Sequence, residues 1–292
     1  MSGQPAQGSQ ADLDLLPGGP SGQAFGAPEA LSKVPEITLI FWVLKLLSTG
    51  MGEAMSDFLG QQSVPLAGAI GVFGLWFALW LQLRQCEYRA PIYWFAVMMV
   101  AIFGTMAADG VHDGASISYA ITTPVFAIVV AAIFYLWHRS EGTLSIHGIT
   151  TRRRETFYWA AVLATFALGT AAGDLTALSL KLGFFPSVLL FAVAISTPAL
   201  AWWRLRLDPI LAFWLAYIVT RPLGASFADW FSKRGNGGLG LGDGTVSAIA
   251  LVVFLGLVGY VAATKCDVQD APHEEHPHLY LEAHRELATE PE

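Results

Sequence analysis

Four aspartates recur at one position of a repeated pattern, within segments that are otherwise apolar. Each stands five residues after a glycine and fifteen residues after a tryptophan, so the pattern is Trp-x9-Gly-x4-Asp. The residues are Trp42, Gly52 and Asp57; Trp94, Gly104 and Asp109; Trp159, Gly169 and Asp174; and Trp214, Gly224 and Asp229. A carboxylate inside an apolar segment must face another polar group, water or a cation, so these aspartates are the first candidates for chemistry.

Further oxygen-bearing side chains accompany the aspartates. Glu53 precedes Asp57 by four residues, which places both carboxylates on one face of a helix. The other residues of this kind, with one histidine, are Thr105, Thr170, His112, Asp113 and Asp243. Oxygen ligands suit Mg²⁺, Ca²⁺ and Mn²⁺. The sequence therefore predicts a cation or proton site made by the four repeat aspartates with Glu53, Asp113 and Asp243, in which the aspartates and Glu53 are the metal ligands.

Three methionines, Met51, Met55 and Met106, flank the acidic positions. A thioether near the site would favour a transition metal over Mg²⁺ or Ca²⁺, which places Mn²⁺ first and Mg²⁺ second as the substrate. Packing of flexible side chains in a core is the alternative interpretation of these methionines.

Several neighbouring carboxylates cannot all be ionised without a cation, so some would hold protons when the site is empty. Binding of the cation would then release protons. Arg221 breaks the repeat, since the equivalent positions hold Thr49, Ala101 and Phe166. It is either a countercharge for the carboxylates once the cation has left, or part of a structural salt bridge. Pro222 follows and predicts a kinked or unwound helix there.

The composition indicates which elements position these residues. Of the 292 residues, 54% are hydrophobic and 13% are charged, and the mean hydropathy is +0.51. Soluble domains carry about 25% charged residues, so the chain is a polytopic helical membrane protein whose direct partner is the lipid bilayer. A net charge of −7 gives no basic surface for nucleic acid. No motif of a hydrolase or phosphate-binding enzyme occurs, so we expect no enzyme, no catalytic residue and no cofactor.

Apolar stretches of about 20 residues are long enough to cross a bilayer. Eight are predicted, at 37–59, 63–83, 91–111, 117–137, 156–179, 185–203, 209–231 and 242–264. They form a membrane domain over residues 36–265, with two-helix repeats at about 37–84, 90–139, 155–206 and 209–264. Residues 1–35 are interpreted as a disordered tail, and residues 266–292 as an acidic tail whose histidines, in the string HEEHPH, are either a metal-binding tract or solvated polar residues.

The distribution of lysine and arginine sets the expected orientation. Eleven of them fall on the side that holds both termini, and three fall on the other side. The three are Lys181, Lys233 and Arg234. We therefore expect both termini in the cytoplasm and a bacterial inner-membrane location. Cys86 and Cys266 then lie on the reducing side as free thiols. Lys45 is expected to extend its ammonium group toward the cytoplasmic interface.

Because each repeat holds two helices, successive repeats enter the membrane in the same direction. The fold class is therefore an all-α membrane protein, with eight transmembrane helices as four parallel two-helix repeats around a pseudo-symmetric acidic centre. The tryptophans and the Gly-x4-Asp segments resemble a family of bacterial integral membrane proteins with four tandem two-helix repeats. The resemblance covers residues 37–264 and implies this architecture, but no settled activity.

The residues favour a proton-coupled exporter of a divalent metal cation. A proton-coupled carrier of a small organic solute and a membrane scaffold that transports nothing are the alternatives. The identity of the substrate, the stoichiometry and the oligomeric state stay open.

Overall fold

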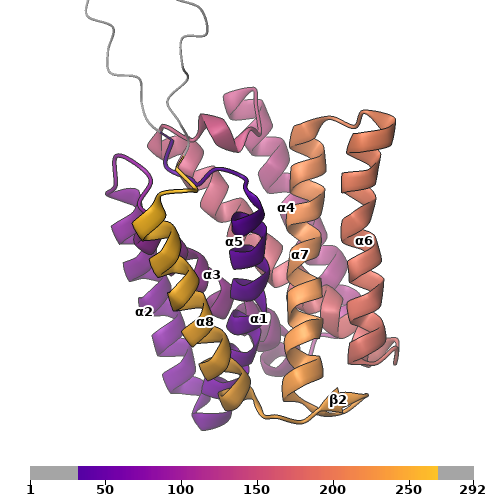
Figure 1. The fold of residues 1–292 in the computed structure, drawn as a ribbon. Helices are drawn as coiled ribbons and strands as arrows, with labels where there is room; N and C mark the ends of the chain where they lie inside the picture. Colours follow the sequence, from indigo (N-terminus) through magenta and orange to yellow (C-terminus); the bar gives the residue numbers. More distant parts are fainter. Residues whose placement is uncertain (1–31, 269–292) are drawn as a thin grey trace, which may run out of the picture. The chain divides into compact units, whose positions relative to one another are not determined.

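A computed structural model describes residues 32–268, and these residues are almost entirely helical (Figure 1). The long helices are α1 (Leu39–Gln62), α2 (Val64–Leu83), α3 (Ala90–Asp109), α4 (Tyr119–Glu141), α5 (Arg152–Asp174), α6 (Phe184–Leu205), α7 (Pro209–Ser232) and α8 (Asp243–Thr264). Most of the predicted N-terminal tail and the histidine-rich string lie outside the described residues.

Seven of these eight helices, α2 to α8, are long and apolar enough to cross a membrane. The exception is α1, in which Lys45, Glu53 and Asp57 lower the hydropathy. The chain is therefore a multi-pass membrane protein. Each predicted span overlaps one helix, although the observed bounds differ by a few residues: the first helix, for example, begins at Leu39 and ends at Gln62.

Local signals explain where several helices begin. The hydroxyl of Thr38 accepts a hydrogen bond from the backbone N–H of Phe41 and caps α1, and Thr151 caps α5 in the same manner. Asp208 caps α7 by accepting from the backbone N–H of Leu211. Proline stands in the first turns of α2, α3 and α7, where its missing N–H costs nothing.

The odd-numbered helices lie inside the bundle and the even-numbered helices lie outside. The apolar stretches of α3, α5 and α7 are 50% to 61% buried, against 17% to 22% for α2, α4, α6 and α8. Large apolar side chains such as Phe73 and Val193 are exposed on the outer helices. In a membrane protein these side chains are suited to face lipid, while the polar residues of the inner helices are hidden.

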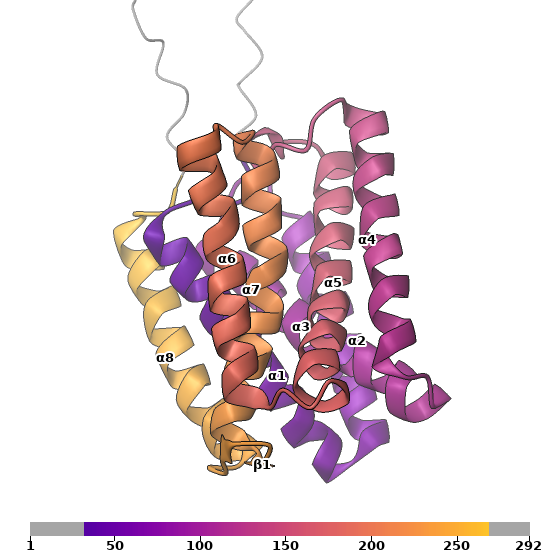
Figure 2. The same cartoon turned by 90° about the vertical axis from the view of Figure 1, so that its right-hand side faces the viewer.

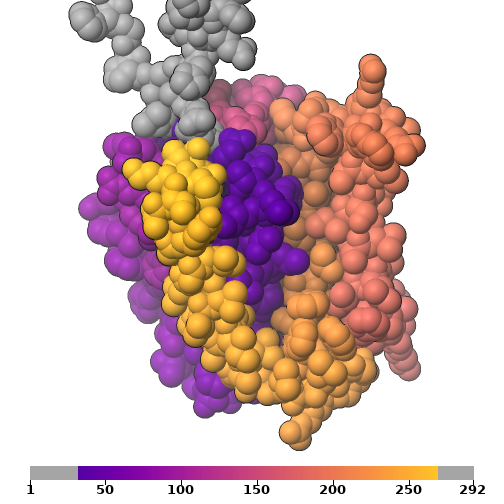
Figure 3. All heavy atoms as spheres, viewed as in Figure 1, coloured from indigo at the N-terminus to yellow at the C-terminus, as the bar shows by residue number. Residues whose placement is uncertain are grey.

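The inner helices contact one another in a closed order, α1 to α3, α3 to α5, α5 to α7, and α7 back to α1. The outer helices pack mainly on the following inner helix: α2 on α3, α4 on α5, α6 on α7, and α8 on α1 (Figures 1 and 2). The space-filling view shows α8 lying against α1, with α7 on the other side of α1 (Figure 3). The last repeat therefore closes on the first.

The repeat glycines lie where neighbouring inner helices approach most closely. A Cβ atom at any of them would clash with a side chain of the next inner helix. The pairs are Gly52 with Ala101, Gly104 with Phe166, Gly169 with Arg221, and Gly224 with Thr49. The partner always stands three residues before the glycine of its own repeat. Small residues allow helices in a membrane to pack this closely, so the repeated glycine is explained by one contact that occurs at all four interfaces.

The repeat tryptophans form a second set of equivalent contacts. The aromatic residue that precedes each tryptophan packs on the tryptophan of the next repeat. Ring centroids are 5.9 Å apart for Phe41 and Trp94, 5.5 Å for Tyr93 and Trp159, 6.2 Å for Tyr158 and Trp214, and 5.7 Å for Phe213 and Trp42. These contacts link each inner helix to its neighbour at the level of the tryptophans, ten residues before the repeat glycines.

An unwound helix at Pro222 and a Lys45 side chain that reaches an interface were expected, and the structure shows neither. The helix α7 continues without interruption from Pro209 to Ser232, so Pro222 does not unwind it. The helix α7 packs on α6, α1 and α5 along this course. The side chain of Lys45 does not reach an interface, because Lys45 is only 1% exposed and its ammonium group lies between the rings of Phe166 and Tyr217.

A short hairpin connects α7 to α8. Its strands are β1 (Arg234–Gly235) and β2 (Gly238–Leu239), joined by Asn236 and Gly237, which both have positive φ angles. Two residues of this kind match the twist of a tight antiparallel hairpin. We call this end of the bundle the hairpin end, and the opposite end, where α1 begins and α8 ends, the terminal end (Figure 1).

Candidate functional site

All four repeat aspartates line one cavity of about 980 Å³ at the hairpin end of the bundle. Because they occupy the same position in four neighbouring inner helices, they meet there although they lie far apart in the sequence. Six residues with carboxylates line the cavity, namely Asp57, Asp109, Asp113, Asp174, Asp229 and Glu53. Only Lys233 and Arg234 among its lining residues carry a fixed positive charge. The lining therefore has an excess of acidic groups.

Three carboxylates lie closest to one another. One oxygen each of Glu53, Asp57 and Asp229 fall within 4.8 Å of one another. Oxygens on opposite sides of a bound Mg²⁺, Mn²⁺ or Ca²⁺ are about 4–5 Å apart. These distances suit one divalent cation, which would compete with Lys233 for Asp57 and with Arg221 for Glu53.

The two remaining repeat aspartates come from α3 and α5. Asp109 and Asp174 are the last α-helical residues before two short π-helical segments, η1 (Gly110–Gly114) and η3 (Leu175–Ser179). Such π segments are frequent at functional sites, where they widen a helix locally. Asp174 and Asp229 are 9% and 6% exposed, and both line the cavity. The side chain of Asp229 has no hydrogen-bond or salt-bridge partner among the described residues.

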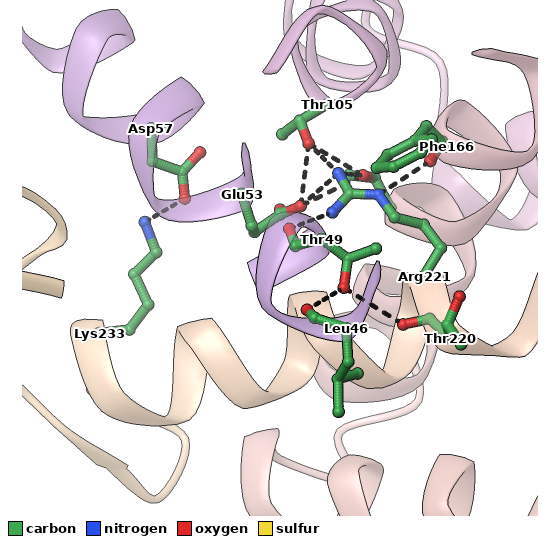
Figure 4. A network of polar contacts seen from close by, with 10 residues as sticks. Leu46, Thr49, Glu53, Asp57, Thr105, Phe166, Thr220, Arg221 and Lys233 are labelled. Carbon is green, nitrogen blue, oxygen red and sulfur yellow. Dashed lines mark hydrogen bonds and ion pairs between the residues drawn. The ribbon is translucent and has the colours of Figure 1, made fainter. Parts of the chain in front are cut away.

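Arg221 lies among the inner helices next to Glu53, which lines the cavity (Figure 4). Its guanidinium group donates to the Glu53 carboxylate at 2.9 Å, to the hydroxyl of Thr170 at 2.8 Å and to the carbonyl of Thr49 at 2.6 Å, and it also contacts the hydroxyl of Thr105. Arg221 and Glu53 are 1% and 3% exposed. The two ions therefore form a buried salt bridge that draws groups from all four inner helices together.

Glu53 has further hydrogen bonds beyond this salt bridge. The hydroxyls of Thr105 and Thr170 donate to its carboxylate at 3.0 Å and 3.3 Å. Both threonines stand at the position of Glu53 in their own repeats. Four residues before the repeat aspartate, the second and third repeats thus have a hydroxyl where the first repeat has the Glu53 carboxylate. The fourth repeat has Ala225 at this position. The small side chain of Ala225 leaves room beside the guanidinium group, which reaches Glu53 from the previous turn of α7.

Lys233 is a second cation at the site, and the sequence interpretation missed its role. Its ammonium group lies 2.6 Å from Asp57 and 3.1 Å from Asp243. Partial burial alone would lower the pKa of Lys233, but the charges of Asp57, Asp229 and Asp243 outweigh this effect and hold the pKa above its usual value. Lys233 follows Asp229 by four residues, a helical spacing that could have indicated this position.

Asp243 lies beside the cavity and is not among its lining residues. It accepts a hydrogen bond from Gln61 at 2.5 Å and pairs with Lys233. Asp243 also begins α8, where a negative charge is favourable. Its observed contacts connect the start of α8 to the end of α1; Gln61 and Lys233 both donate to Oδ2, and Oδ1 has no hydrogen-bond partner among the described residues.

The remaining candidate residues are spread over three environments. His112 and Met106 line the cavity, and the ring of His112 stacks on Tyr119 with centroids 3.8 Å apart while its Nδ1 lies 2.8 Å from the carbonyl of Ile117. Asp113 is exposed at the cavity mouth. Met51 is buried in the apolar core, and Met55 is half-buried and packs against the core. Of the methionines in residues 32–268, only Met106 lines the cavity.

The fold and the acidic cavity define a polytopic membrane protein built from helical repeats. A family model described as a repeat of unknown function, DUF347, matches residues 92–143, 157–208 and 212–266. These three matches cover more than half of the chain, and the protein belongs to this repeat family. The segment 37–84 lies outside the matches but has the same Trp, Gly and Asp spacing. No curated protein and no solved structure matches the chain.

Proposed function

We propose that this protein is a transporter that exchanges a divalent metal cation for protons, with Mn²⁺ as the preferred substrate and Mg²⁺ as the second. The observation that carries the proposal is the convergence of the four repeat aspartates and Glu53 on one cavity of the helical bundle. The oxygen-rich lining supports a hard divalent cation, and the thioether of Met106 supports Mn²⁺ over Mg²⁺.

We infer that the four repeats are parallel and surround a common axis, and that all eight helices cross the membrane. The cyclic contacts of the repeat glycines and of the repeat tryptophans support this arrangement. The inferred orientation places both termini in the cytoplasm of a bacterial inner membrane. The hairpin end and the acidic cavity then lie toward the outer side, which is the basis for export as the direction of transport.

Coupling to protons follows from the crowding of the acidic groups. Carboxylates this close together repel one another when they are all ionised, so without a cation several of them hold protons. A divalent cation that binds among them displaces these protons. Arg221 supports the same cycle, because its guanidinium group pairs with Glu53 and can neutralise that carboxylate once the metal has left.

A second candidate is a proton-coupled carrier of a small organic solute. The observation in its favour is the size of the cavity, about 980 Å³, which lies at the upper end of the range for small-molecule sites. In that case the aspartates carry only protons, and transport depends on them while no metal binds.

Transport by purified protein in liposomes tests the proposal. A metal indicator and a pH indicator inside the vesicles follow both species after addition of Mn²⁺. We expect Mn²⁺ to enter while protons leave, and we expect Asp229→Asn to abolish both signals. Asp208→Asn is the matched control, since Asp208 is exposed and lies at the terminal end. Proton movement driven by an organic solute, in the absence of metal flux, would favour the second candidate.

A further inference from the structure

Lys45 is a buried cationic residue that the proposed metal site does not use. It lies on α1, it is 1% exposed, and its ammonium nitrogen has no hydrogen-bond partner among residues 32–268. The nitrogen lies 3.9 Å from the ring centre of Phe166 and 4.0 Å from that of Tyr217. A lysine with three unsatisfied donors inside a membrane protein is costly, and such residues are candidates for function by default.

The surroundings of Lys45 do not account for it as a structural charge. The described residues place no carboxylate within salt-bridge distance of its nitrogen. Its ionic neighbour is Arg221, whose guanidinium carbon lies 4.8 Å from the centre of the same Phe166 ring. The faces of Phe166 and Tyr217 are the groups that can stabilise an ammonium here, and they replace neither the hydrogen bonds of water nor a carboxylate partner. A permanent charge at this place is therefore poorly supported.

The position of Lys45 links two polar regions of the bundle. Glu53 lies eight residues further along α1, about 12 Å toward the hairpin end. Toward the terminal end follow four buried tyrosines, Tyr217, Tyr158, Tyr93 and Tyr88, which we call the tyrosine column. The hydroxyls of Tyr158 and Tyr93 are hydrogen-bonded to each other, and the hydroxyl of Tyr88 donates to Asp267. The rings of Tyr88 and Tyr93 lie 5.5 Å apart.

Asp267 ends this series at the terminal end of the bundle. It follows the exposed Cys266 and is itself 1% exposed. Burial raises the pKa of the Asp267 carboxyl, although the hydrogen bond from Tyr88 acts in the opposite direction. A carboxyl of this kind exchanges protons closer to neutral pH than an ordinary aspartate does.

We propose that Lys45 carries protons between the acidic cavity and the tyrosine column. Its neutral amine takes up the proton that a carboxylic acid of the cavity releases when the metal binds, and it becomes an ammonium. The ammonium then gives one proton to the hydroxyl of Tyr217, which has no hydrogen-bond partner among residues 32–268. Tyr217 passes its own proton to Tyr158, and Tyr158, Tyr93 and Tyr88 pass one proton each onward to the Asp267 carboxylate, so the amine is restored. This inference rests on the proton coupling of the proposed function and assigns to it a residue outside the metal site.

Two kinds of Mn²⁺ flux in liposomes that contain the full-length protein separate the carrier from the metal site. Exchange of Mn²⁺ for Mn²⁺ at equal pH needs no net proton transfer, whereas net Mn²⁺ movement against protons does. We expect Lys45→Met to keep the exchange and to slow the net movement about tenfold or more. Lys45→Arg, a permanent cation, should show the same loss. Lys181→Met is the matched control, since Lys181 is exposed.

Net Mn²⁺ movement at the wild-type rate in Lys45→Met or in Lys45→Arg would overturn Lys45 as the proton carrier. If Lys45→Met does not fold, Tyr158→Phe takes its place, because it keeps the ring and removes the hydroxyl that bonds to Tyr93. It should lower net movement and leave exchange intact, and an unchanged rate would overturn the tyrosine column as the path.

Failure of the proposed function has a different outcome. If the wild type moves no Mn²⁺ at all, proton entry driven by a potassium diffusion potential is measured without metal. Proton entry that is present in the wild type and lost in Lys45→Met would support the carrier and overturn only metal transport. Equal proton entry in both proteins, or none in either, would overturn the carrier as well.

Discussion

The salt bridge between Arg221 and Glu53 is the most buried ionic contact of the site, and its partners come from different repeats. Removing one partner of such a pair leaves an uncompensated charge and costs about 3–5 kcal/mol. We therefore expect Arg221→Met to lower the stability of the purified protein by this amount. Adding Glu53→Gln should recover a large part of the loss, because the remaining amide is neutral and keeps its threonine donors.

Thermal unfolding of the wild type, Arg221→Met, Glu53→Gln and the double variant in one detergent measures the coupling between the two side chains. Arg234→Met is the control for the loss of an arginine, since Arg234 is exposed on the hairpin. A double variant that is as unstable as the two single losses added together would mean that the two side chains do not act as a pair. It would also remove Arg221 as the countercharge of the proposed cycle.

At the residue scale, the sequence predicted that the four aspartates are equivalent, and it did not predict their partners. The spacing predicted Asp57, Asp109, Asp174 and Asp229 as equivalent, and they line one cavity. The partner of Asp57 is Lys233, which is 176 positions away and outside any periodic pattern of α1. The burial of Lys45 was also not predictable, because it depends on Phe166 and Tyr217 from two other helices.

At the scale of helices, the repeat glycines determine how closely the inner helices approach. A Cβ atom at Gly224 would clash with Thr49, whereas nothing lies within 4 Å of a Cβ atom placed at Gly68 of α2. We expect Gly224→Ala to destabilise the protein by about 1–3 kcal/mol through overpacking. Gly68→Ala, the matched control, should be neutral or slightly stabilising because alanine favours the helix.

The thermal midpoints of the two alanine variants measure this difference. Gly52→Ala should behave like Gly224→Ala, because its Cβ atom would meet Ala101 across the next interface. Equal midpoints for Gly224→Ala and Gly68→Ala would contradict the close contact between α1 and α7, and with it the closure of the ring.

Helix positions were largely predictable and their local irregularities were not. Apolar stretches of the right length predicted each helix to within a few residues. The π-helical segments after Asp109 and Asp174 have no signal in the composition of those stretches. The unbroken course of α7 through Pro222 likewise has no signal in the sequence, because proline locally tends to break a helix.

At the scale of the whole molecule, the proposed orientation makes the two native cysteines accessible from the cytoplasm only. Cys86 and Cys266 are exposed; Cys86 lies between the end of α2 and the start of α3, and Cys266 follows the end of α8, so both belong to the terminal end. A membrane-impermeant maleimide should therefore label neither in intact spheroplasts and both in inside-out vesicles. In a variant without native cysteines, Leu239→Cys on the hairpin should give the reverse result, since Leu239 is 56% exposed at the hairpin end.

Labelling of the native cysteines in intact spheroplasts would mean that the protein has the opposite orientation in the membrane. The cavity would then face the cytoplasm, and the proposed direction of transport would change from export to import. Because the distribution of lysine and arginine carries the orientation, this experiment also tests how well eleven residues against three determine it in this chain.

The arrangement of the four repeats was predictable in outline only. A repeated Trp-x9-Gly-x4-Asp pattern in alternate helices predicts equivalent positions around an axis. Which helix lies next to which is decided by contacts such as Gly169 with Arg221 and Gly224 with Thr49, and a single sequence does not contain them. Glu53, Thr105, Thr170 and Ala225 occupy equivalent positions in the four repeats. Their arrangement around Arg221, for which the small Ala225 leaves room, could not be predicted without knowing which helices are neighbours.

The central claim is that the repeat aspartates hold a divalent cation, and direct binding to the purified protein tests it most directly. Thermal midpoints and metal content are measured with Mn²⁺, Mg²⁺, Ca²⁺, Zn²⁺ and Co²⁺ for the wild type and for the variant with Asp57→Asn and Asp174→Asn together. Asp208→Asn is the control. Saturating binding to the folded state stabilises it by about 2.7 kcal/mol at a ligand concentration 100 times the Kd.

The account predicts a saturable stabilisation of the wild type and of the control, largest with Mn²⁺ and absent from the double variant, together with bound metal in the same two proteins. If none of the five cations stabilises the wild type or remains bound to it, the metal site is contradicted, and the aspartates would act as proton carriers or as structural contacts between the repeats.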